Sequence, residues 1–142
     1  MNLFKQGRNW FVVDIRDALF DELYDIMKVD SRVMLLVADM GAWKMEQIVR
    51  DLPQQYMNVG IAEQNLIGVA AGLALVGRRV FVYGIAAFVS DRCYEQIKMD
   101  LCEMNLPVTI IGAGPGLSYG SDGPSHHAIH DIAVMSQFPN MF

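Results

Sequence analysis

An acidic residue, Glu63, opens an Ala- and Gly-rich segment whose apolar spacing predicts a helix over residues 63–75. An acid in the first turn stabilises a helix through its dipole by about 0.3–1 kcal/mol, so Glu63 has a purely structural interpretation. Its neighbours Ile61 and Ala62 and the small residues that follow predict close packing, which would place the carboxylate in a dry crevice. There it could share a proton with a heterocyclic nitrogen. Both interpretations stay open on these residues alone.

A second segment of chemical interest is the glycine-rich stretch over residues 112–130, which reads GAGPGLSYGSDGPSHHAIH and follows an apolar run. Its GAGPG start resembles the phosphate-binding GxGxxG motif, but Leu117 stands at the third glycine position and no helix pattern follows. Too little chain remains for the βαβ unit that such a motif requires. The pattern therefore does not indicate dinucleotide binding, and a loop of this length indicates another functional role.

The same stretch gathers three histidines and two acids, in the order Asp122, His126, His127, His130 and Asp131. Histidines at i and i+4 can share a metal on one helix face, but no HExxH pattern is present and the segment begins in a turn. We therefore predict no metal site in this chain. The glycines instead allow the backbone to turn one histidine and one aspartate toward a cavity, where they could bind a polar substrate.

The composition of the chain bounds the class of protein. Its 142 residues, 53% of them hydrophobic, suffice for one domain, residues 1–142. The net charge of -5, without a basic cluster, predicts neither a nucleic-acid nor an anionic-membrane partner. Cys93 and Cys102 form neither a disulfide framework nor a CxxC pair, and no export signal or membrane span is evident. We therefore expect a soluble, cytoplasmic protein.

The methionine content, ten residues in a chain with a mean hydropathy of +0.24, is high for this length. It indicates either apolar surface that another subunit covers or a methionine-rich core, and composition does not separate the two.

The hydrophobic pattern alternates helices with short apolar strands. Helices are predicted over residues 15–29, 44–52, 63–75 and 89–103, and strands over residues 33–38, 56–59, 80–83 and 107–111. This alternation predicts an α/β fold, a doubly wound and mostly parallel sheet with helices on both faces. Ligands of such folds bind beyond the carboxyl ends of the strands, where Asp39, Glu63, Phe88 and the loop over residues 112–130 are expected.

Three segments together resemble the pyrimidine-binding domain of transketolases. They are residues 58–77 with GIAEQN, residues 88–108 with FVSDRCYEQI, and residues 118–141 with DGPSHHAIHD. The resemblance covers most of the chain and is nearest to the small C-terminal subunit of split transketolases. Deoxyxylulose-phosphate synthase and the β subunit of 2-oxo-acid dehydrogenases are more distant relatives. It implies the Pyr domain of the thiamine-diphosphate-binding fold.

The resemblance assigns cofactor roles to four residues. Glu63 matches the glutamate that hydrogen-bonds the aminopyrimidine ring nitrogen and so enables the cofactor's amino-derived nitrogen to take the proton from the thiazolium carbon. Phe88 matches an aromatic that packs on the pyrimidine face, and Asp39 an aspartate near the cofactor. Ile85 stands where many relatives carry a second aromatic against the ring, so the ring is expected to be held less tightly.

Substrate roles are implied for three further residues. His126 resembles the histidine that hydrogen-bonds the donor ketose near its carbonyl, and would act in catalysis with Glu63. Asp122 resembles an aspartate that reads a hydroxyl configuration, and Arg16 an arginine that contacts sugar phosphate. Gly114 stands where transketolases usually place a phosphate-contacting histidine, which suggests an unphosphorylated or otherwise modified sugar.

The family binds the cofactor diphosphate through Mg²⁺, which a GDG motif and a later Asn hold in a separate domain. No GDG occurs in this sequence. The resemblance therefore implies a larger diphosphate-binding partner subunit and an assembly that is a dimer of heterodimers. The sequence ends at Phe142, where relatives continue, so we expect the last part of the domain and the domain that follows it to be absent.

The function implied is a transketolase subunit, active only with its partner, that transfers a two-carbon ketol unit between sugars or sugar phosphates. Two alternatives remain. One is the β subunit of a 2-oxo-acid dehydrogenase or a synthase of the deoxyxylulose type. The other is a catalytically silent regulatory or scaffolding module, which Ile85 favours and the joint presence of Glu63, Phe88 and His126 disfavours.

Overall fold

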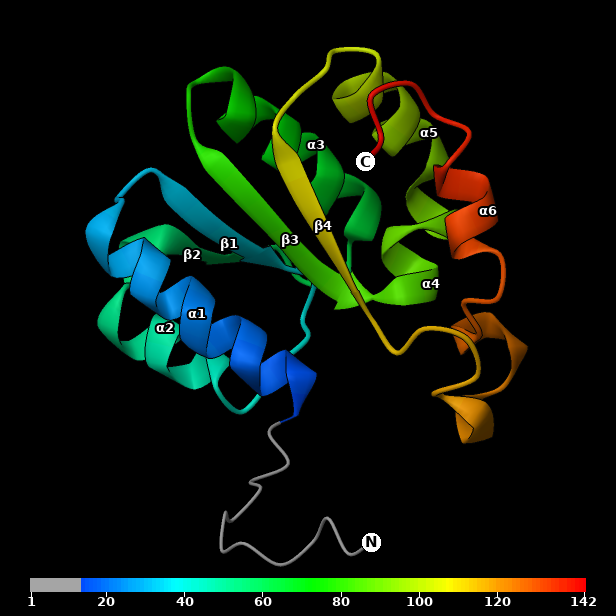
Figure 1. Ribbon diagram of the computed structural model, residues 1–142, viewed down its shortest axis with the longest axis horizontal. Helices are drawn as coiled ribbons and strands as arrows, with labels where there is room; N and C mark the ends of the chain where they lie inside the picture. Colours follow the sequence, from blue (N-terminus) through cyan, green and yellow to red (C-terminus); the bar gives the residue numbers. More distant parts are fainter. Residues whose placement is uncertain (1–13) are drawn as a thin grey trace, which may run out of the picture.

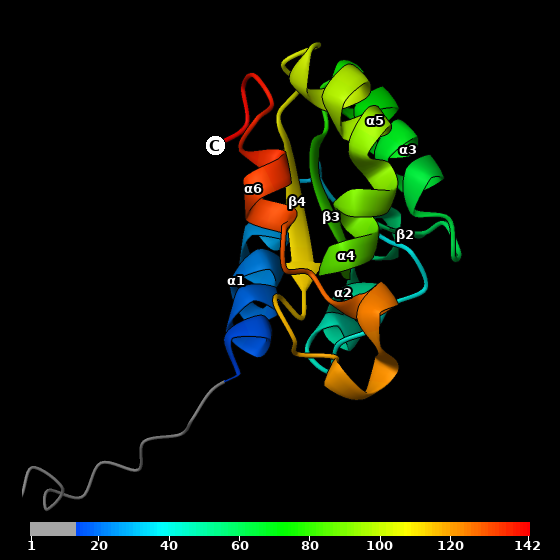
Figure 2. The same ribbon diagram turned by 90° about the vertical axis from the view of Figure 1, so that its right-hand side faces the viewer.

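The architecture is a four-stranded parallel sheet between two layers of helices, seen in a computed structural model that describes residues 14–142. The strand order is β2-β1-β3-β4, and every neighbouring pair is parallel. Figure 1 shows the sheet from one face, and Figure 2 shows helices on both sides of it. The α/β fold with a parallel, doubly covered sheet that the sequence predicts is confirmed.

The strands are β1 (Val33–Val37), β2 (Tyr56–Asn58), β3 (Arg79–Ile85) and β4 (Val108–Ala113). The longer helices are α1 (Ile15–Val29), α2 (Met45–Asp51) and α3 (Glu63–Leu75), and a short α6 (Asp131–Met135) lies near the C-terminal end of the chain. Both α1 and α3 begin and end where the apolar spacing predicts. At the start of α1, the Asp14 side chain accepts a hydrogen bond from the Arg16 N–H, which caps the helix.

Alternating residues of β1 divide the core into two clusters, one on each face of the sheet. All five residues of β1 are buried. Leu35 and its odd-numbered neighbours pack with Phe20 of α1 and Ile48 of α2. Leu36 and its even-numbered neighbours pack with α3, where Leu66 is fully buried. This continuous burial is why the sequence of β1 is apolar without interruption.

The prediction of one helix over residues 89–103 is wrong. A short α4 (Ala86–Val89) ends where the predicted helix begins, and a 3₁₀ turn η2 (Asp91–Cys93), a short α5 (Tyr94–Gln96) and a π-helix η3 (Ile97–Cys102) follow it. The break coincides with Ser90, whose buried hydroxyl donates to the Ala86 carbonyl at 2.6 Å. Such a bond competes with regular helix geometry, and a π-helix widens the turn that follows.

The described residues, 14–142, contain no helix both long and apolar enough to cross a bilayer. Their methionines divide between two environments. Met27, Met34 and Met45 lie in the core, whereas Met99 and Met104 are about half exposed. Both explanations of the methionine content, a methionine-rich core and an apolar surface, therefore have a counterpart in the structure.

Candidate active site

Asn58, the last residue of β2, organises the turn between the strand ends and Glu63. Its side-chain oxygen accepts hydrogen bonds from the backbone N–H groups of Asp39, at 3.0 Å, and Gly60, at 2.9 Å. Its amide nitrogen donates to the Asp39 carboxylate at 3.3 Å. Asp39 and Gly60 both have positive φ, 52° and 78°, so the backbone turns sharply on each side. These contacts fix the segment that leads into α3.

Glu63, the first residue of α3, is a buried acid with only 5% of its surface exposed. Its Oε2 accepts a hydrogen bond from Arg92 Nη1 at 2.7 Å, which is a salt bridge between α3 and the 3₁₀ turn after α4. The guanidinium and the N-terminal end of α3 thus both lie beside the carboxylate. Glu63 is therefore buried, as the sequence predicts, and it has a cationic partner that was not among the predicted site residues.

Phe88, on α4, lies between two side chains that bear nitrogen. The Arg92 guanidinium carbon is 4.0 Å from the centre of its ring, and the His126 ring lies edge-on with centroids 4.8 Å apart. His126 also lies 6.0 Å, centroid to centroid, from Tyr119. Glu63, Arg92, Phe88 and His126 thus form one continuous series of contacts along the carboxyl edge of the sheet.

Cys93, the residue after Arg92, is fully buried beside the series of contacts from Glu63 to His126. Burial raises the pKa of the Cys93 thiol from its usual 9.0 to about 12, and the negative charge of Glu63 adds to the increase. The thiol donates to the Phe88 carbonyl at 3.3 Å. Cys93 is therefore a structural residue here rather than a nucleophile.

In the glycine-rich loop after β4, the ring of Tyr119 occupies the space beside Gly114 where a side chain at position 114 would lie. Gly114 has φ 71°, and a Cβ built on it would overlap the Tyr119 ring. The space that a histidine at this position would need is therefore filled. Tyr119 was not among the predicted site residues, and the missing side chain at Gly114 is the only signal in the sequence that pointed toward it.

Two other predicted site residues lie around this series without a direct contact to it. Asp122 is exposed on the 3₁₀ turn η4 (Gly120–Asp122), four residues before His126. Ile85 is the last residue of β3 and directly precedes α4, where it is partly buried.

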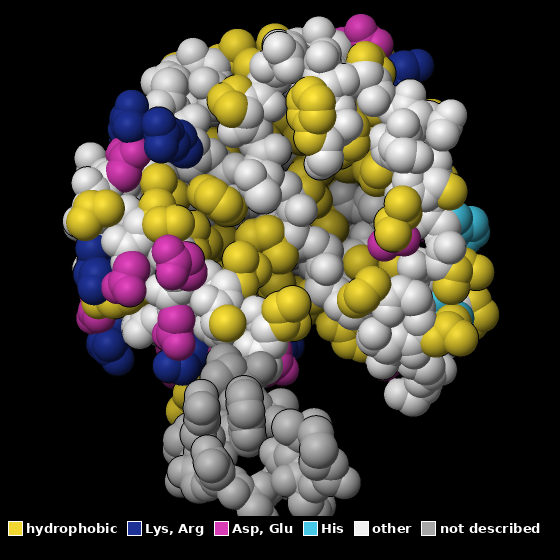
Figure 3. Space-filling model, viewed as in Figure 1, with side chains coloured by type: hydrophobic (Ala, Val, Ile, Leu, Met, Phe, Trp, Pro, Cys, Tyr) yellow, Lys and Arg dark blue, Asp and Glu magenta, His cyan; other side chains and the backbone are white. Residues whose placement is uncertain are grey.

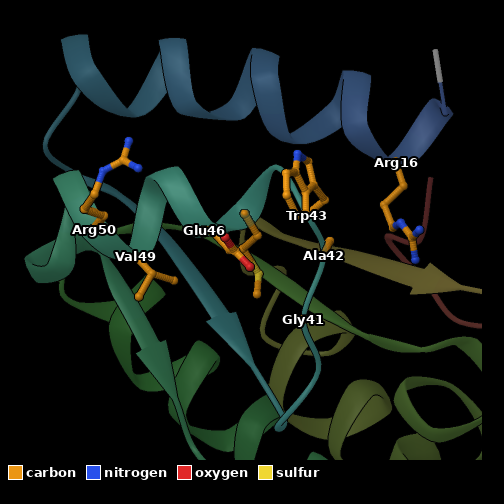
Figure 4. A pocket seen from close by; sticks show the side chains of 8 residues that line it. Arg16, Gly41, Ala42, Trp43, Glu46, Val49 and Arg50 are labelled. Atoms are coloured by element: carbon orange, nitrogen blue, oxygen red, sulfur yellow. The ribbon is translucent and has the colours of Figure 1, made fainter.

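Arg16 lies apart from Glu63, in the first turn of α1. It lines a cavity of about 540 Å³ with Trp43 and with Glu46, Val49 and Arg50 of α2 (Figure 4). It also lines a second cavity, of about 500 Å³, with Gly114 and Tyr119. Arg16 therefore lines both cavities, the one beside α2 and the one beside the glycine-rich loop.

Tyr83, on β3, lies near Arg16. Its hydroxyl is buried and has no hydrogen-bond partner among the described residues. Burial raises the pKa of this phenol, and the nearby Arg16 guanidinium opposes the increase without forming a hydrogen bond.

The structure thus brings together Glu63, Phe88 and His126 through Arg92 and leaves Arg16 and Asp122 at the periphery. Asn58 connects Asp39 to Gly60, in the turn before Glu63. Arg92 and Asn58 were not among the site residues predicted from the sequence. Arg92 stands four residues after Phe88, a helical spacing that places two side chains on one face, and this was the signal available.

The chemistry of the residues present fits an aminopyrimidine ring. A buried carboxylate can accept a hydrogen bond from a ring nitrogen that bears a proton, and Phe88 provides an aromatic surface for stacking. Within residues 14–142 no group of three His, Cys, Asp or Glu side chains is arranged to hold a metal ion.

Comparison with known proteins defines the class. Residues 12–142 match the family described as "Transketolase, pyrimidine binding domain". An apulose-4-phosphate transketolase subunit from Phocaeicola vulgatus is 37% identical over 131 residues, 92% of this chain and 42% of that protein. The 6-deoxy-6-sulfo-D-fructose transketolase subunit SqwH of a Clostridium species is 34% identical over 128 residues, 89% of this chain and 40% of that protein. Deoxyxylulose-phosphate synthases are also among the relatives.

Among solved structures, a split-gene transketolase described as an inactive beta4 tetramer superimposes with a TM-score of 0.74 at 34% identity, over 88% of this chain and 40% of that one. The chain belongs to the transketolase family, and the part of the family that it matches is the pyrimidine-binding domain. It spans about two fifths of the length of these relatives.

Proposed function

We propose that the chain supplies the pyrimidine half of a thiamine-diphosphate site in a split transketolase, which transfers a two-carbon ketol unit between sugars. The single observation that carries this proposal is Glu63, a carboxylate that is 95% buried at the carboxyl edge of the sheet and joined through Arg92 to the Phe88 ring. Its partner Arg92 is 43% exposed, so Glu63 is the buried member of the pair, and a buried acid with one specific charge partner is a candidate functional residue.

In the proposed site Glu63 accepts a hydrogen bond from the pyrimidine ring nitrogen, Phe88 packs against the ring, and Asp39 lies nearby at the end of β1. Bound thiamine diphosphate supplies the carbanion chemistry of the transfer. The protein's part is to orient the ring, hold a proton on its nitrogen and exclude water. Ile85 offers an aliphatic rather than an aromatic contact, so part of the ring's packing must come from Phe88.

Sugar binding falls to residues beside this ring. His126 lies 4.8 Å from Phe88, centroid to centroid, which supports a role next to the reacting carbonyl of the donor. Asp122 is exposed on the same loop and can bind a hydroxyl further along the sugar. Arg16 lies across the second cavity from Tyr119, where it can bind an anionic end.

A larger partner subunit would hold the diphosphate and its Mg²⁺, in a dimer of heterodimers. Large apolar side chains at the site edge support such a partner, since Ile61 is 78% exposed, Ile129 65% and Ile132 81%. Hydrophobic side chains also gather in the middle of the face shown in Figure 3. The cytoplasm is the proposed location, because both cysteines are free and buried.

The sugar is proposed to be unphosphorylated or otherwise modified at its end. The Tyr119 ring occupies the space that a phosphate-binding histidine at position 114 would need. The two relatives named above act on apulose-4-phosphate and on 6-deoxy-6-sulfo-D-fructose, so the terminal group varies among relatives. The rates of ketol transfer from a ketose, its phosphate and its 6-sulfo analogue test this part of the proposal. A strong preference for the phosphate would refute it.

The decisive assay reconstitutes the chain with candidate large subunits, thiamine diphosphate and Mg²⁺, and follows ketol transfer. We expect activity only in the mixture and a loss of roughly 10²–10⁴-fold with Glu63→Ala. Gln64→Ala is the matched control, since Gln64 is the exposed neighbour of Glu63. Activity of the isolated chain would contradict the half-site, and full activity of Glu63→Ala would remove the assigned role.

A second function within the enzyme class follows from the deoxyxylulose-phosphate synthase relatives. Such an enzyme, like a 2-oxo-acid dehydrogenase β subunit, would consume a 2-oxo acid and release CO₂, whereas ketol transfer between sugars releases none. Adding pyruvate to the same mixture separates the two. A silent scaffolding module would form the complex without either reaction, and the joined contacts of Glu63, Phe88 and His126 argue against it.

A further inference from the structure

Arg92 contacts both groups to which the pyrimidine recognition is assigned. Its Nη1 lies 2.7 Å from Glu63 Oε2, and its guanidinium carbon lies 4.0 Å from the centre of the Phe88 ring. The Glu63 side chain is 6% exposed, whereas that of Arg92 is 43% exposed. The carboxylate end of the salt bridge is therefore buried, and the guanidinium end is partly exposed to solvent.

A guanidinium group shares three properties with an aminopyrimidine ring. It is planar, its N–H groups donate to a carboxylate, and its delocalised electrons stack on aromatic rings. A ring bound by Glu63 would compete with Arg92 for the Glu63 carboxylate. A ring packed on the same side of Phe88 would also compete with Arg92 for that surface.

We propose that Arg92 is a placeholder, which occupies the pyrimidine position of the unliganded chain and is displaced when the cofactor binds. This inference rests on the proposed function of Glu63 and Phe88. Arg92 neutralises a buried carboxylate that would otherwise lack a partner, and so maintains the crevice before the cofactor arrives.

The position of Arg92 in the chain suits such a movement. It lies on the 3₁₀ turn η2, outside α3 and α4, so its side chain can rotate into solvent without moving either helix. Once it leaves, the proton on the ring nitrogen takes over the compensation of the Glu63 charge. Arg92 therefore lowers the apparent affinity for the cofactor, because its own contacts must break first.

Calorimetric titration of the two-subunit complex with thiamine diphosphate and Mg²⁺ tests the proposal. Arg92→Met keeps an unbranched aliphatic stem and removes the planar cation. We expect it to bind the cofactor roughly 5- to 30-fold more tightly than wild type, the range set by one partly exposed ion pair and one cation–π contact. Arg92→Lys retains the charge without the planar group. We expect its affinity for the cofactor to lie between those of wild type and Arg92→Met. Lys98→Met removes an exposed charge nearby in the sequence and should leave the affinity unchanged.

Two further variants separate failure of this inference from failure of the function on which it rests. If Glu63→Gln and Phe88→Ala both bind the cofactor as wild type does, the proposed function fails. If they weaken binding while Arg92→Met binds equally or more weakly than wild type, only the placeholder is overturned.

A structure of the wild-type complex with bound cofactor gives an answer that does not depend on whether the variants fold. We expect Arg92 to have left both Glu63 and the Phe88 ring. A guanidinium still bonded to Glu63 beside the cofactor would contradict the displacement.

Discussion

Asn58 holds Asp39 by two hydrogen bonds, one to the backbone N–H at 3.0 Å and one to the carboxylate at 3.3 Å. Asn58 ends β2, and Asp39 stands two residues beyond the end of the neighbouring strand β1 and adopts the left-handed backbone conformation, with φ 52°. Because Asn58 also binds the N–H of Gly60, it connects the end of β1 to the turn before Glu63. One amide thus positions two of the proposed cofactor-binding residues.

Asn58→Ala is expected to lower the free energy of unfolding by about 1–2 kcal/mol, since three solvent-exposed hydrogen bonds are lost and Asp39 keeps its unfavourable φ. Urea denaturation of the chain measures this. Asn65→Ala, at an exposed position on α3, is the control and should change it by less than about 0.5 kcal/mol. Equal effects of the two substitutions would show that the Asn58 contacts do not stabilise the turn.

Gly114 and Gly116 offer a matched pair for the Tyr119 contact. Both have positive φ, 71° and 62°, but a Cβ at Gly116 meets nothing within 4 Å, whereas one at Gly114 meets the Tyr119 ring. Both alanine variants therefore bear the backbone cost of about 1–2 kcal/mol, and Gly114→Ala bears an additional steric cost. We expect it to be the less stable of the two in thermal unfolding.

The additional cost should vanish in a Tyr119→Ala background, where nothing opposes the new methyl group. If Gly114→Ala remains less stable than Gly116→Ala in that background, the ring of Tyr119 is not the cause.

Gln55 is a buried amide that ties α1 to β1. Its Nε2 lies within 3.1 Å of the carbonyls of Met27, Asp30 and Val33. Gln55→Glu replaces a donor with an acceptor among three carbonyl oxygens, so we expect a loss of about 2–4 kcal/mol in the free energy of unfolding. Gln54→Glu, at the exposed neighbouring position, is the control and should be nearly neutral. Comparable losses at the two positions would contradict the role given to the buried amide.

The pH dependence of stability should carry a contribution from Cys93. Its pKa is raised by burial from 9.0 to about 12 in the folded chain, so its stabilising contribution is complete below pH 9 and is lost as the pH rises toward 12. Tyr83, whose pKa is also raised by burial, adds to the same trend at the upper end. We therefore predict that the free energy of unfolding falls less steeply from pH 9 to 12 in Cys93→Ala than in wild type. Parallel curves would contradict the assignment.

The regular elements were predictable because their signals are local. The helix α3 begins at Glu63 and ends at Leu75, where the spacing of small and apolar residues predicted, and β1 is buried along its whole length as its composition indicates. The helix after Phe88 was not predictable, because its break depends on one hydroxyl bond from Ser90 and on a π turn. Neither changes the apolar spacing of the sequence.

The site, like the regular elements, was predictable where the signal is local and not where it depends on tertiary packing. The rule that parallel strands present ligand-binding residues at their carboxyl ends placed Glu63 and Phe88 on one edge, and the structure adds His126 beside them. The salt bridge from Arg92 joins residues 29 positions apart. Such a pairing depends on how the 3₁₀ turn η2 packs against α3, and a single sequence does not carry that information.

The most direct test of the central claim, that Glu63 activates the cofactor, is the rate at which the thiazolium carbon of bound thiamine diphosphate exchanges its proton for deuterium. This rate isolates the proton transfer from sugar binding, and the reconstituted complex should be compared with its Glu63→Gln variant at equal cofactor occupancy. The account predicts an exchange that is slower by roughly 10²–10⁴-fold in the variant, the usual contribution of a positioned acid or base. Equal exchange rates in the two complexes would contradict it.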